Sequence, residues 1–189
     1  MTRTRALLGR IHDLPAPAGL RRLPDPTSDV NPWEAIAADP QRLLRLQVCE
    51  PAWLDAHLDE LRAAAADAPT AGQALVHLDV HAANLWHQNG RLVLVDWAAA
   101  AVGNPWLDHH TWLMFLHAEG GPPPEAQQGP HAAGHAALIA GQQPLLAPSR
   151  DANPVLFAAR RRYLTVALGW AARLLGIAPP RQSLPRSDQ

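Results

Sequence analysis

The stretch that decides the fold lies near the middle of the chain and reads His77-Leu78-Asp79-Val80-His81-Ala82-Ala83-Asn84-Leu85-Trp86. Apolar residues on either side of Asn89-Gly90 follow it, and the second apolar run ends at Asp96-Trp97. Asn-Gly is a strong hairpin signal because both residues tolerate positive φ angles. The sequence therefore predicts a β-hairpin whose open end brings Asn84 and Asp96 together, although twelve positions separate them.

The polar side chains around this hairpin are of the kinds that phosphoryl transfer requires. Asp79 follows the short apolar strand predicted over 74–76, and it could accept or orient the proton of an attacking hydroxyl. Asn84 offers an amide oxygen and Asp96 a carboxylate, and magnesium prefers such hard oxygen ligands. We therefore predict a catalytic base at Asp79 and magnesium ligands at Asn84 and Asp96. We interpret His77 as a loop support that acts through hydrogen bonds.

The rest of the chain is predominantly helical in its patterning. Helical periodicity predicts helices over 3–14, 50–66, 105–118, 132–141 and 154–175, with short helical pieces over 32–46. The apolar face of the last helix is predicted to hold Leu156, Ala159, Tyr163, Val166 and Trp170. Residues 15–32 are proline-rich and predict an irregular connection, and the polar tail over 179–189 is expected to be disordered. The predicted fold class is mainly α with a small catalytic β-hairpin.

Composition narrows the classes of function. The formal net charge is −1, which gives no electrostatic case for binding nucleic acid or an anionic membrane. No apolar run is long enough to span a membrane. A single cysteine, Cys49, excludes an intrachain disulfide and a cysteine zinc site. We expect a cytoplasmic protein that binds neither nucleic acid nor a membrane.

These motifs resemble the aminoglycoside phosphotransferase and choline kinase family of small-molecule kinases. Its pattern runs approximately H-G-D-x-H-x-x-N, an apolar strand, D-W and G-x-P-x-x-D. Here the last motif is Gly103-Asn104-Pro105-Trp106-Leu107-Asp108, and Leu78 stands at the usual glycine. The resemblance implies that residues 1–178 form the C-terminal lobe of a protein-kinase-like fold. It implies Asp79 as the catalytic base, Asn84 and Asp96 as Mg²⁺ ligands, and Asp108 as a brace for the loop. The implied reaction transfers the γ-phosphoryl group of ATP to a small-molecule hydroxyl.

One departure concerns the nucleotide. All sixteen cationic residues are arginine, so the lysine that contacts ATP phosphates in kinases is missing, as is a glycine-rich loop. We therefore expect the N-terminal lobe to be absent. The chain alone is expected to be incomplete or inactive, with a separately encoded N-terminal lobe as a candidate partner.

Two alternatives stay open. The chain could be a non-catalytic remnant or binding module of the same fold. It could also be a metal-dependent hydrolase, because His77, Asp79 and His81 alternate and would share one face of a strand. The His109-His110 pair keeps this second alternative open, although it is more simply explained as part of a helix packing face.

Overall fold

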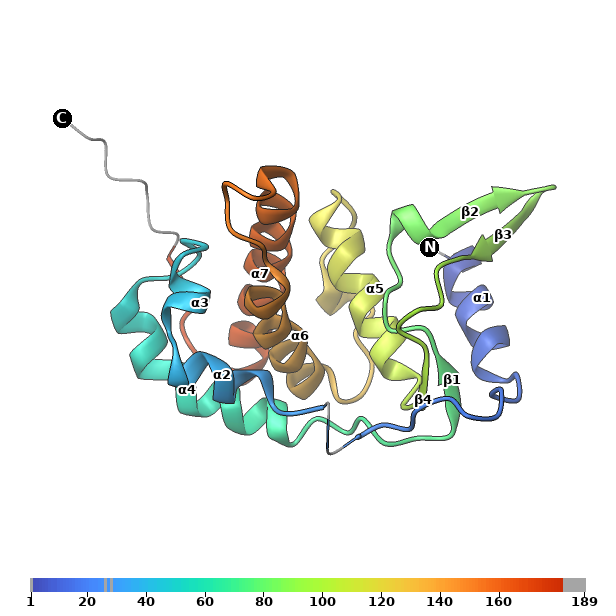
Figure 1. The fold of residues 1–189 in the computed structure, drawn as a ribbon, viewed down its shortest axis with the longest axis horizontal. Coiled ribbons are helices and arrows are strands. Elements are labelled where there is room, and N and C mark those ends of the chain that lie inside the picture. Colours follow the sequence, from blue (N-terminus) through green and yellow to red (C-terminus); the bar gives the residue numbers. More distant parts are fainter. Residues whose placement is uncertain (1, 26, 28, 182–189) are drawn as a thin grey trace. The chain divides into compact units, whose positions relative to one another are not determined.

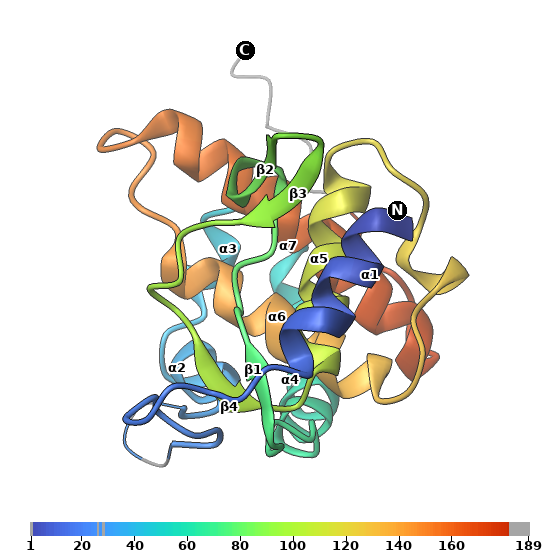
Figure 2. The ribbon, with the colours of Figure 1, turned by 90° about the vertical axis from the view of Figure 1, so that its right-hand side faces the viewer.

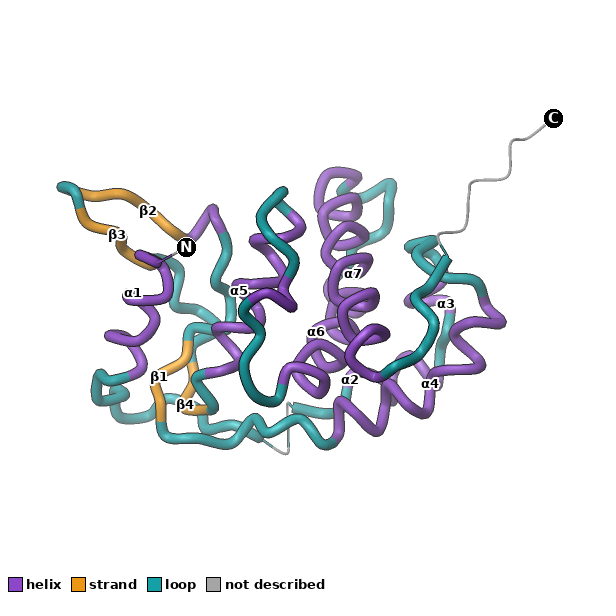
Figure 3. Tube along the Cα trace, turned by 180° about the vertical axis from the view of Figure 1, so that it is seen from behind, coloured by secondary structure: helices purple, strands orange, loops and turns teal. Residues whose placement is uncertain are grey.

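The computed structural model describes residues 2–25, 27 and 29–181, and the chain divides into two compact units. Of these described residues, those within 2–30 and 69–131 belong to unit 1, and those within 31–68 and 132–181 belong to unit 2. Figures 1 and 3 show that every strand among the described residues lies in unit 1. Most of the tail for which disorder was expected, residues 182–189, falls outside the described residues.

The described part of unit 1 combines two α-helices and two short 3₁₀ helices, labelled η, with four short strands. Its elements are α1 (Thr2–His12), β1 (Ala74–Val76), η1 (Ala82–Asn84), β2 (Leu85–Gln88), β3 (Arg91–Leu94), β4 (Ala101–Gly103), α5 (Trp106–Ala118) and η2 (Pro124–Ala126). Residues 15–25 form neither a helix nor a named strand, as the prolines predict; Arg22 makes only an isolated bridge to Val102.

The predicted hairpin is confirmed. Strands β2 and β3 pair antiparallel, with Leu85 opposite Leu94. Asn89 has φ 51° and Gly90 has φ 75°, so both turn residues take the left-handed conformation that this dipeptide favours. The second apolar run continues to Asp96, but strand β3 ends earlier, at Leu94, and Asp96 lies beyond it with φ 62°. At Asp96 the backbone leaves the extended conformation, so the strand does not continue.

A second strand pair was not predicted. β4 pairs antiparallel with β1, so that Leu75 lies opposite Val102. The sequence Ala-Val-Gly of β4 is too short to show a period, and its partner lies far away in the chain. The pairing nevertheless matters for the site, because it fixes β1 directly before the loop that begins at His77.

Side chains from α1, the strands and α5 form the core of unit 1. Figure 2 shows α1 beside α5, and β3 also lies next to α1. Large apolar side chains of this kind each contribute about 1.5–3 kcal/mol when fully buried. The buried cluster consists of Leu7, Leu8, Ile11, Leu75, Val80, Leu94, Trp112 and Leu113.

Unit 2 is helical in its described part. Its elements are α2 (Pro32–Ala38), α3 (Gln41–Leu44), α4 (Pro51–Ala66), α6 (Ala132–Leu146) and α7 (Pro154–Leu175), and α6 and α7 lie side by side (Figures 1 and 3). Trp33 is fully buried, and its indole N–H donates to the carbonyl of Ala137 at 2.9 Å. A Cβ at Gly141 would lie 2.8 Å from the Trp33 Nε1 atom, so this close helix contact requires glycine.

Helix α6 is longer than predicted. It continues to Leu146 with Pro144 in its last turn, whereas the sequence suggested an end near Gly141. The guanidinium of Arg45 donates to the carbonyls of Pro144 and Ala147 at 3.2 and 2.6 Å. These bonds satisfy carbonyl groups that a helix end leaves without intrahelical partners.

The predicted apolar face of α7 is partly wrong. Leu156 is 37% exposed, while Leu164 and Leu168 are fully buried. The remaining buried residues of α7 are Ala167, Gly169, Trp170, Ala171 and Ala172. Small residues dominate this set because α6 packs closely against α7. Among the helices of the described chain, none has both the length and the apolar character needed to cross a bilayer.

Candidate functional site

The motif loop begins at a buried carboxylate. Asp108 lies in the first turn of α5 and has no exposed surface. Its Oδ1 atom accepts the backbone N–H of Leu78 at 2.7 Å, and both carboxylate oxygens accept the N–H of His77, at 3.0 and 2.9 Å. His12 Nε2 lies 3.0 Å from Asp108 Oδ2 and ties α1 to the same carboxylate. The bracing that the resemblance implied for Asp108 is thus present.

The sequence before α5 explains why Asp108 is held in place. The side-chain oxygen of Asn104 accepts the backbone N–H of Trp106, the first residue of α5, at 3.0 Å and so holds the start of the helix. The amide nitrogen of Asn104 donates to the carbonyl of Pro69 at 2.8 Å. Asn104 therefore fixes both the start of α5 and the segment that leads into β1.

Leu78 has an unusual backbone conformation. Its φ of 65° lies in the left-handed region, where a side chain with a Cβ is strained. Leu78 stands at the position where the resembling family usually has glycine, which has no Cβ. The hydrogen bond from its N–H to Asp108 holds this conformation in place. The left-handed residue turns the chain between His77 and Asp79.

His77 connects the loop to the segment that contains Asp96. Its Nε2–H donates to the carbonyl of Val95 at 3.0 Å, and its Nδ1 accepts the backbone N–H of Asp79 at 3.2 Å. The ring also meets the Trp97 ring edge to face, with 4.8 Å between centroids. His77 therefore touches the residues on both sides of Asp96, and its predicted role as a loop support is confirmed.

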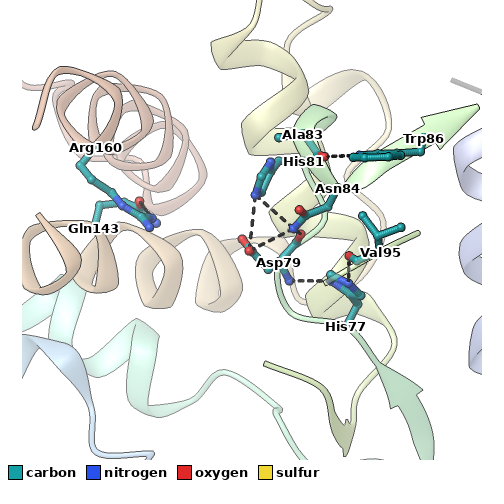
Figure 4. A network of polar contacts seen from close by, with 9 residues as sticks. All are labelled: His77, Asp79, His81, Ala83, Asn84, Trp86, Val95, Gln143 and Arg160. Carbon is teal, nitrogen blue, oxygen red and sulfur yellow. Dashed lines mark hydrogen bonds and ion pairs between the residues drawn. The ribbon is translucent and has the colours of Figure 1, made fainter. Parts of the chain in front are cut away.

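Asp79, His81 and Asn84 form one polar cluster (Figure 4). The Nδ2 atom of Asn84 donates to the Asp79 carbonyl at 2.9 Å and to its Oδ2 at 3.2 Å. His81 Nε2 lies 3.4 Å from Asp79 Oδ2 and 3.2 Å from Asn84 Nδ2. The Nε2 atom of His81 donates to Asp79 when it carries a proton, and it can accept from Asn84 when it does not. The His81 ring packs edge to face on Phe115 of α5, with centroids 5.2 Å apart.

Asp96 lies at the open end of the hairpin. The backbone N–H of Val95 donates to the carbonyl of Asn84 at 3.0 Å, so the pairing extends one residue beyond β2 and β3 toward Asp96. The Asp96 side chain is exposed, and within the described chain its carboxylate makes no hydrogen bond or ion pair. The structure thus places Asn84 and Asp96 at one end of the hairpin, as predicted.

The oxygen atoms of this end suit a hard cation. Asn84 is buried and uses its amide nitrogen for Asp79, and no described residue donates to its Oδ1. An Asn oxygen in this arrangement is available to a ligand, and so is the unpaired carboxylate of Asp96. Both are ligand types that magnesium accepts. The residues present therefore fit the predicted Mg²⁺ site in donor chemistry.

The hydrolase alternative is not supported. Residues 77–81 do not form a strand, and both ring nitrogens of His77 are already hydrogen-bonded within the protein. Among the residues that the structure describes, no group of three or more His, Cys, Asp or Glu side chains is placed to hold a metal ion. A Mg²⁺ site that includes Asn84 is of a different kind from the histidine site that this alternative requires.

The His109-His110 pair belongs to the packing face of α5, as predicted. Both side chains are buried, and His109 Nε2 donates to the carbonyl of Gln127 at 2.9 Å. Burial lowers the pKa of His109 below its ordinary value, the hydrogen bond to Gln127 partly offsets this, and the charges of Arg5 and His12 lower it further. The neutral imidazole is therefore favoured at this position.

The contribution of His12 to the site was missed from the sequence. It lies in the last turn of α1, far along the chain from Asp108, and one histidine at a helix end gives no local signal of such a contact. The edge-to-face contact of Trp97 with His77 was also not predicted. Both contacts depend on tertiary packing, and only the D-W motif drew attention to Trp97.

The chain matches the family model for the phosphotransferase enzyme family over residues 3–140. The matched region contains all of the cluster around Asp79, the hairpin and the brace at Asp108. Comparisons with curated proteins and with solved structures found no significant match.

Proposed function

Because this chain belongs to the phosphotransferase enzyme family, we propose that it is the C-terminal lobe of a small-molecule kinase that transfers the γ-phosphoryl group of ATP to a substrate hydroxyl. One relationship carries this proposal: His77 holds the loop at Asp79 and the segment around Asp96 together. That contact brings the predicted base to the same end of the hairpin as the predicted cation ligands.

Asp79 is proposed as the base. Asn84 holds one of its carboxylate oxygens, Oδ2, while the side chain keeps 41% of its surface exposed. A carboxylate fixed in this way can accept the proton that a hydroxyl loses as its oxygen bonds to phosphorus and the bond to the leaving oxygen breaks. The Asn84 contact then orients the base without blocking its second oxygen.

Asn84 Oδ1 and the carboxylate of Asp96 are the proposed magnesium ligands. A bound Mg²⁺ ion would neutralise negative charge on the phosphate oxygens. Because the Asn84 amide nitrogen is bonded to Asp79, the same side chain would couple the position of the base to that of the ion.

A cation for the ATP phosphates is proposed to come from outside these residues. The 189 residues contain no lysine, and kinases use a strand lysine for this contact. We propose that an N-terminal lobe, encoded separately or upstream, supplies it. Mixing that lobe with the chain should then raise the turnover of ATP far above that of either part alone.

The test is Mg²⁺-dependent ATP binding by calorimetry, followed by phosphoryl transfer to a panel of alcohols, amino alcohols and aminoglycosides in the presence of the N-terminal lobe. Asp79→Asn should lower turnover by about 100-fold or more while leaving ATP binding in place. Asp96→Asn should weaken the Mg²⁺-dependent part of ATP binding. Asp55→Asn, on the exposed face of α4, is the control and should change neither.

The outcomes separate the candidate functions. Binding of ATP without transfer to any acceptor, even with the N-terminal lobe, would favour the binding-module alternative. An Asp79→Asn variant with unchanged turnover would contradict the assigned base. Equal effects of the Asp55 and Asp96 variants would contradict the assigned magnesium ligand.

A further inference from the structure

A cavity in unit 2 is lined by side chains that the proposed reaction does not use. Its volume is about 340 Å³, which lies in the range of small-molecule sites. The lining comes from the end of α3, the connection between α6 and α7, and the first turns of α7. The residues that matter for the argument are Arg45, Gln47, Ser149, Arg150, Phe157 and Arg161.

The charge of this cavity is entirely positive. Three arginines line it, and no aspartate or glutamate does. Arg45 donates to backbone carbonyls, and no described carboxylate forms an ion pair with it. The side chains of Arg150 and Arg161 make no hydrogen bond or ion pair within the part of the chain that the structure describes. Asp151 follows Arg150 in the loop but does not line the cavity.

The start of α7 adds to the same field. Pro154, the first residue of this 22-residue helix, also lines the cavity, and the first turn contains no acidic residue. A helix N-terminus carries a partial positive charge. The helix and the arginines therefore both favour an anionic ligand, and a polycationic ligand would be repelled.

One wall of the cavity is apolar. Phe157 is half-buried and lies one helical turn before Arg161 on the same face of α7. The hydroxyl of Ser149 and the amide of Gln47 add hydrogen-bonding groups. Guanidinium groups beside an aromatic ring suit a ligand that joins an anionic group to an apolar body.

We infer that this cavity binds a small organic anion, with its carboxylate or phosphate group at Arg150 and Arg161 and its apolar part against Phe157. An anion bound here could also be the phosphoryl acceptor. That role rests on the proposed function and would make the acceptor anionic. The binding itself does not depend on the reaction.

The experiment measures binding to the full chain by calorimetry, without nucleotide or magnesium. The probes are benzoate, phenylphosphonate, benzyl alcohol and benzylamine, which share an aromatic ring and differ in charge. We expect the two anions to bind, and the tighter one identifies the preferred group. Added salt should weaken both. Benzyl alcohol should bind more weakly, and benzylamine should not bind.

Matched variants locate the site. Arg161→Gln and Arg150→Gln should each reduce anion affinity about tenfold, because each removes a charged hydrogen-bond donor. Arg162→Gln is the control: Arg162 is exposed on the same helix, lies over the Tyr163 ring at 5.5 Å and does not line the cavity. Phe157→Leu should weaken both benzoate and benzyl alcohol. Thermal melting confirms that each variant is folded.

Three results would overturn the inference: no binding of either anion, equal binding of benzylamine, or the same loss in Arg162→Gln as in Arg161→Gln. Failure here leaves Mg²⁺-dependent ATP binding unaffected. Conversely, loss of ATP binding in Asp96→Asn would leave benzoate binding unaffected. The two proposals can therefore fail separately.

Discussion

The backbone N–H of Leu78 donates to the buried carboxylate of Asp108 across 2.7 Å, and this contact ties the motif loop to the first turn of α5. An asparagine at 108 keeps one oxygen for the N–H of Leu78, but it places an NH₂ group where Oδ2 accepts the N–H of His77 and faces His12. We expect Asp108→Asn to lower the free energy of unfolding by about 3 kcal/mol. Denaturant unfolding measures this change.

The control for this prediction is Asp151→Asn. Asp151 is exposed and has no hydrogen-bonding partner among the described residues, so its variant should stay within about 0.5 kcal/mol of the wild type. Similar losses in both variants would show that general charge, and not the bond to the loop, accounts for the effect.

Leu78 gives a prediction about backbone strain. With φ at 65°, any residue with a Cβ is disfavoured there, and glycine is not. Leu78→Ala and Leu78→Gly both remove the isopropyl group and differ only in the Cβ methyl, so the difference in their stability reports the backbone. We expect the glycine variant to be more stable than the alanine variant by about 1 kcal/mol. A more stable alanine variant would mean that the left-handed conformation is not retained in solution.

The parts of the fold that were predicted correctly have strong local signals. Asn89-Gly90 predicted the hairpin because the turn itself demands positive φ, and α5 begins within one residue of its predicted start, where Asn104 accepts the N–H of Trp106. The helix over 154–175 was predicted with the correct ends, since Asn153 caps it and Gly176 terminates it in the left-handed conformation.

The parts that were missed depend on distant contacts. β4 forms only because β1 is available as a partner, and α6 passes Pro144 while Arg45 satisfies its last carbonyls. The candidate site shows the same division. The hairpin predicted that Asn84 and Asp96 would meet, whereas the brace from His12 to Asp108 joins residues with no sequence relationship.

His109 predicts a dependence of stability on acid. Burial lowers its pKa in the folded protein, so the unfolded chain takes up a proton first as the pH falls below the ordinary value of 6.5. Stability contributed by neutral His109 is therefore complete above that pH and is lost as the pH decreases. His109→Gln keeps a donor for the Gln127 carbonyl but cannot titrate. We expect the unfolding free energy of this variant to decrease less steeply below pH 6.5 than that of the wild type. The difference in slope corresponds to at most one bound proton per molecule.

The comparison requires a histidine outside the core. His87→Gln, at an exposed position of β2, is the control variant and is compared with the wild type in the same titrations. Denaturant titrations at several pH values between 5 and 8 give the slopes. The assignment to His109 fails if its variant keeps the full acid dependence.

Cys49 predicts the opposite pH behaviour, in alkaline solution. Burial and the neighbouring charge of Glu50 raise its pKa from the ordinary 9.0 to about 12. Between these values the unfolded chain loses the thiol proton while the native protein keeps it, so stability is complete below pH 9 and decreases above it. The limiting slope is about 1.4 kcal/mol per pH unit.

The chain has no lysine and one tyrosine, Tyr163, so few other side chains titrate in this range. Cys49→Ala should abolish most of the decrease between pH 9 and 11, and Tyr163→Phe serves as the control. A wild-type protein whose unfolding free energy is constant over this range would show that the thiol is accessible to solvent in the native state.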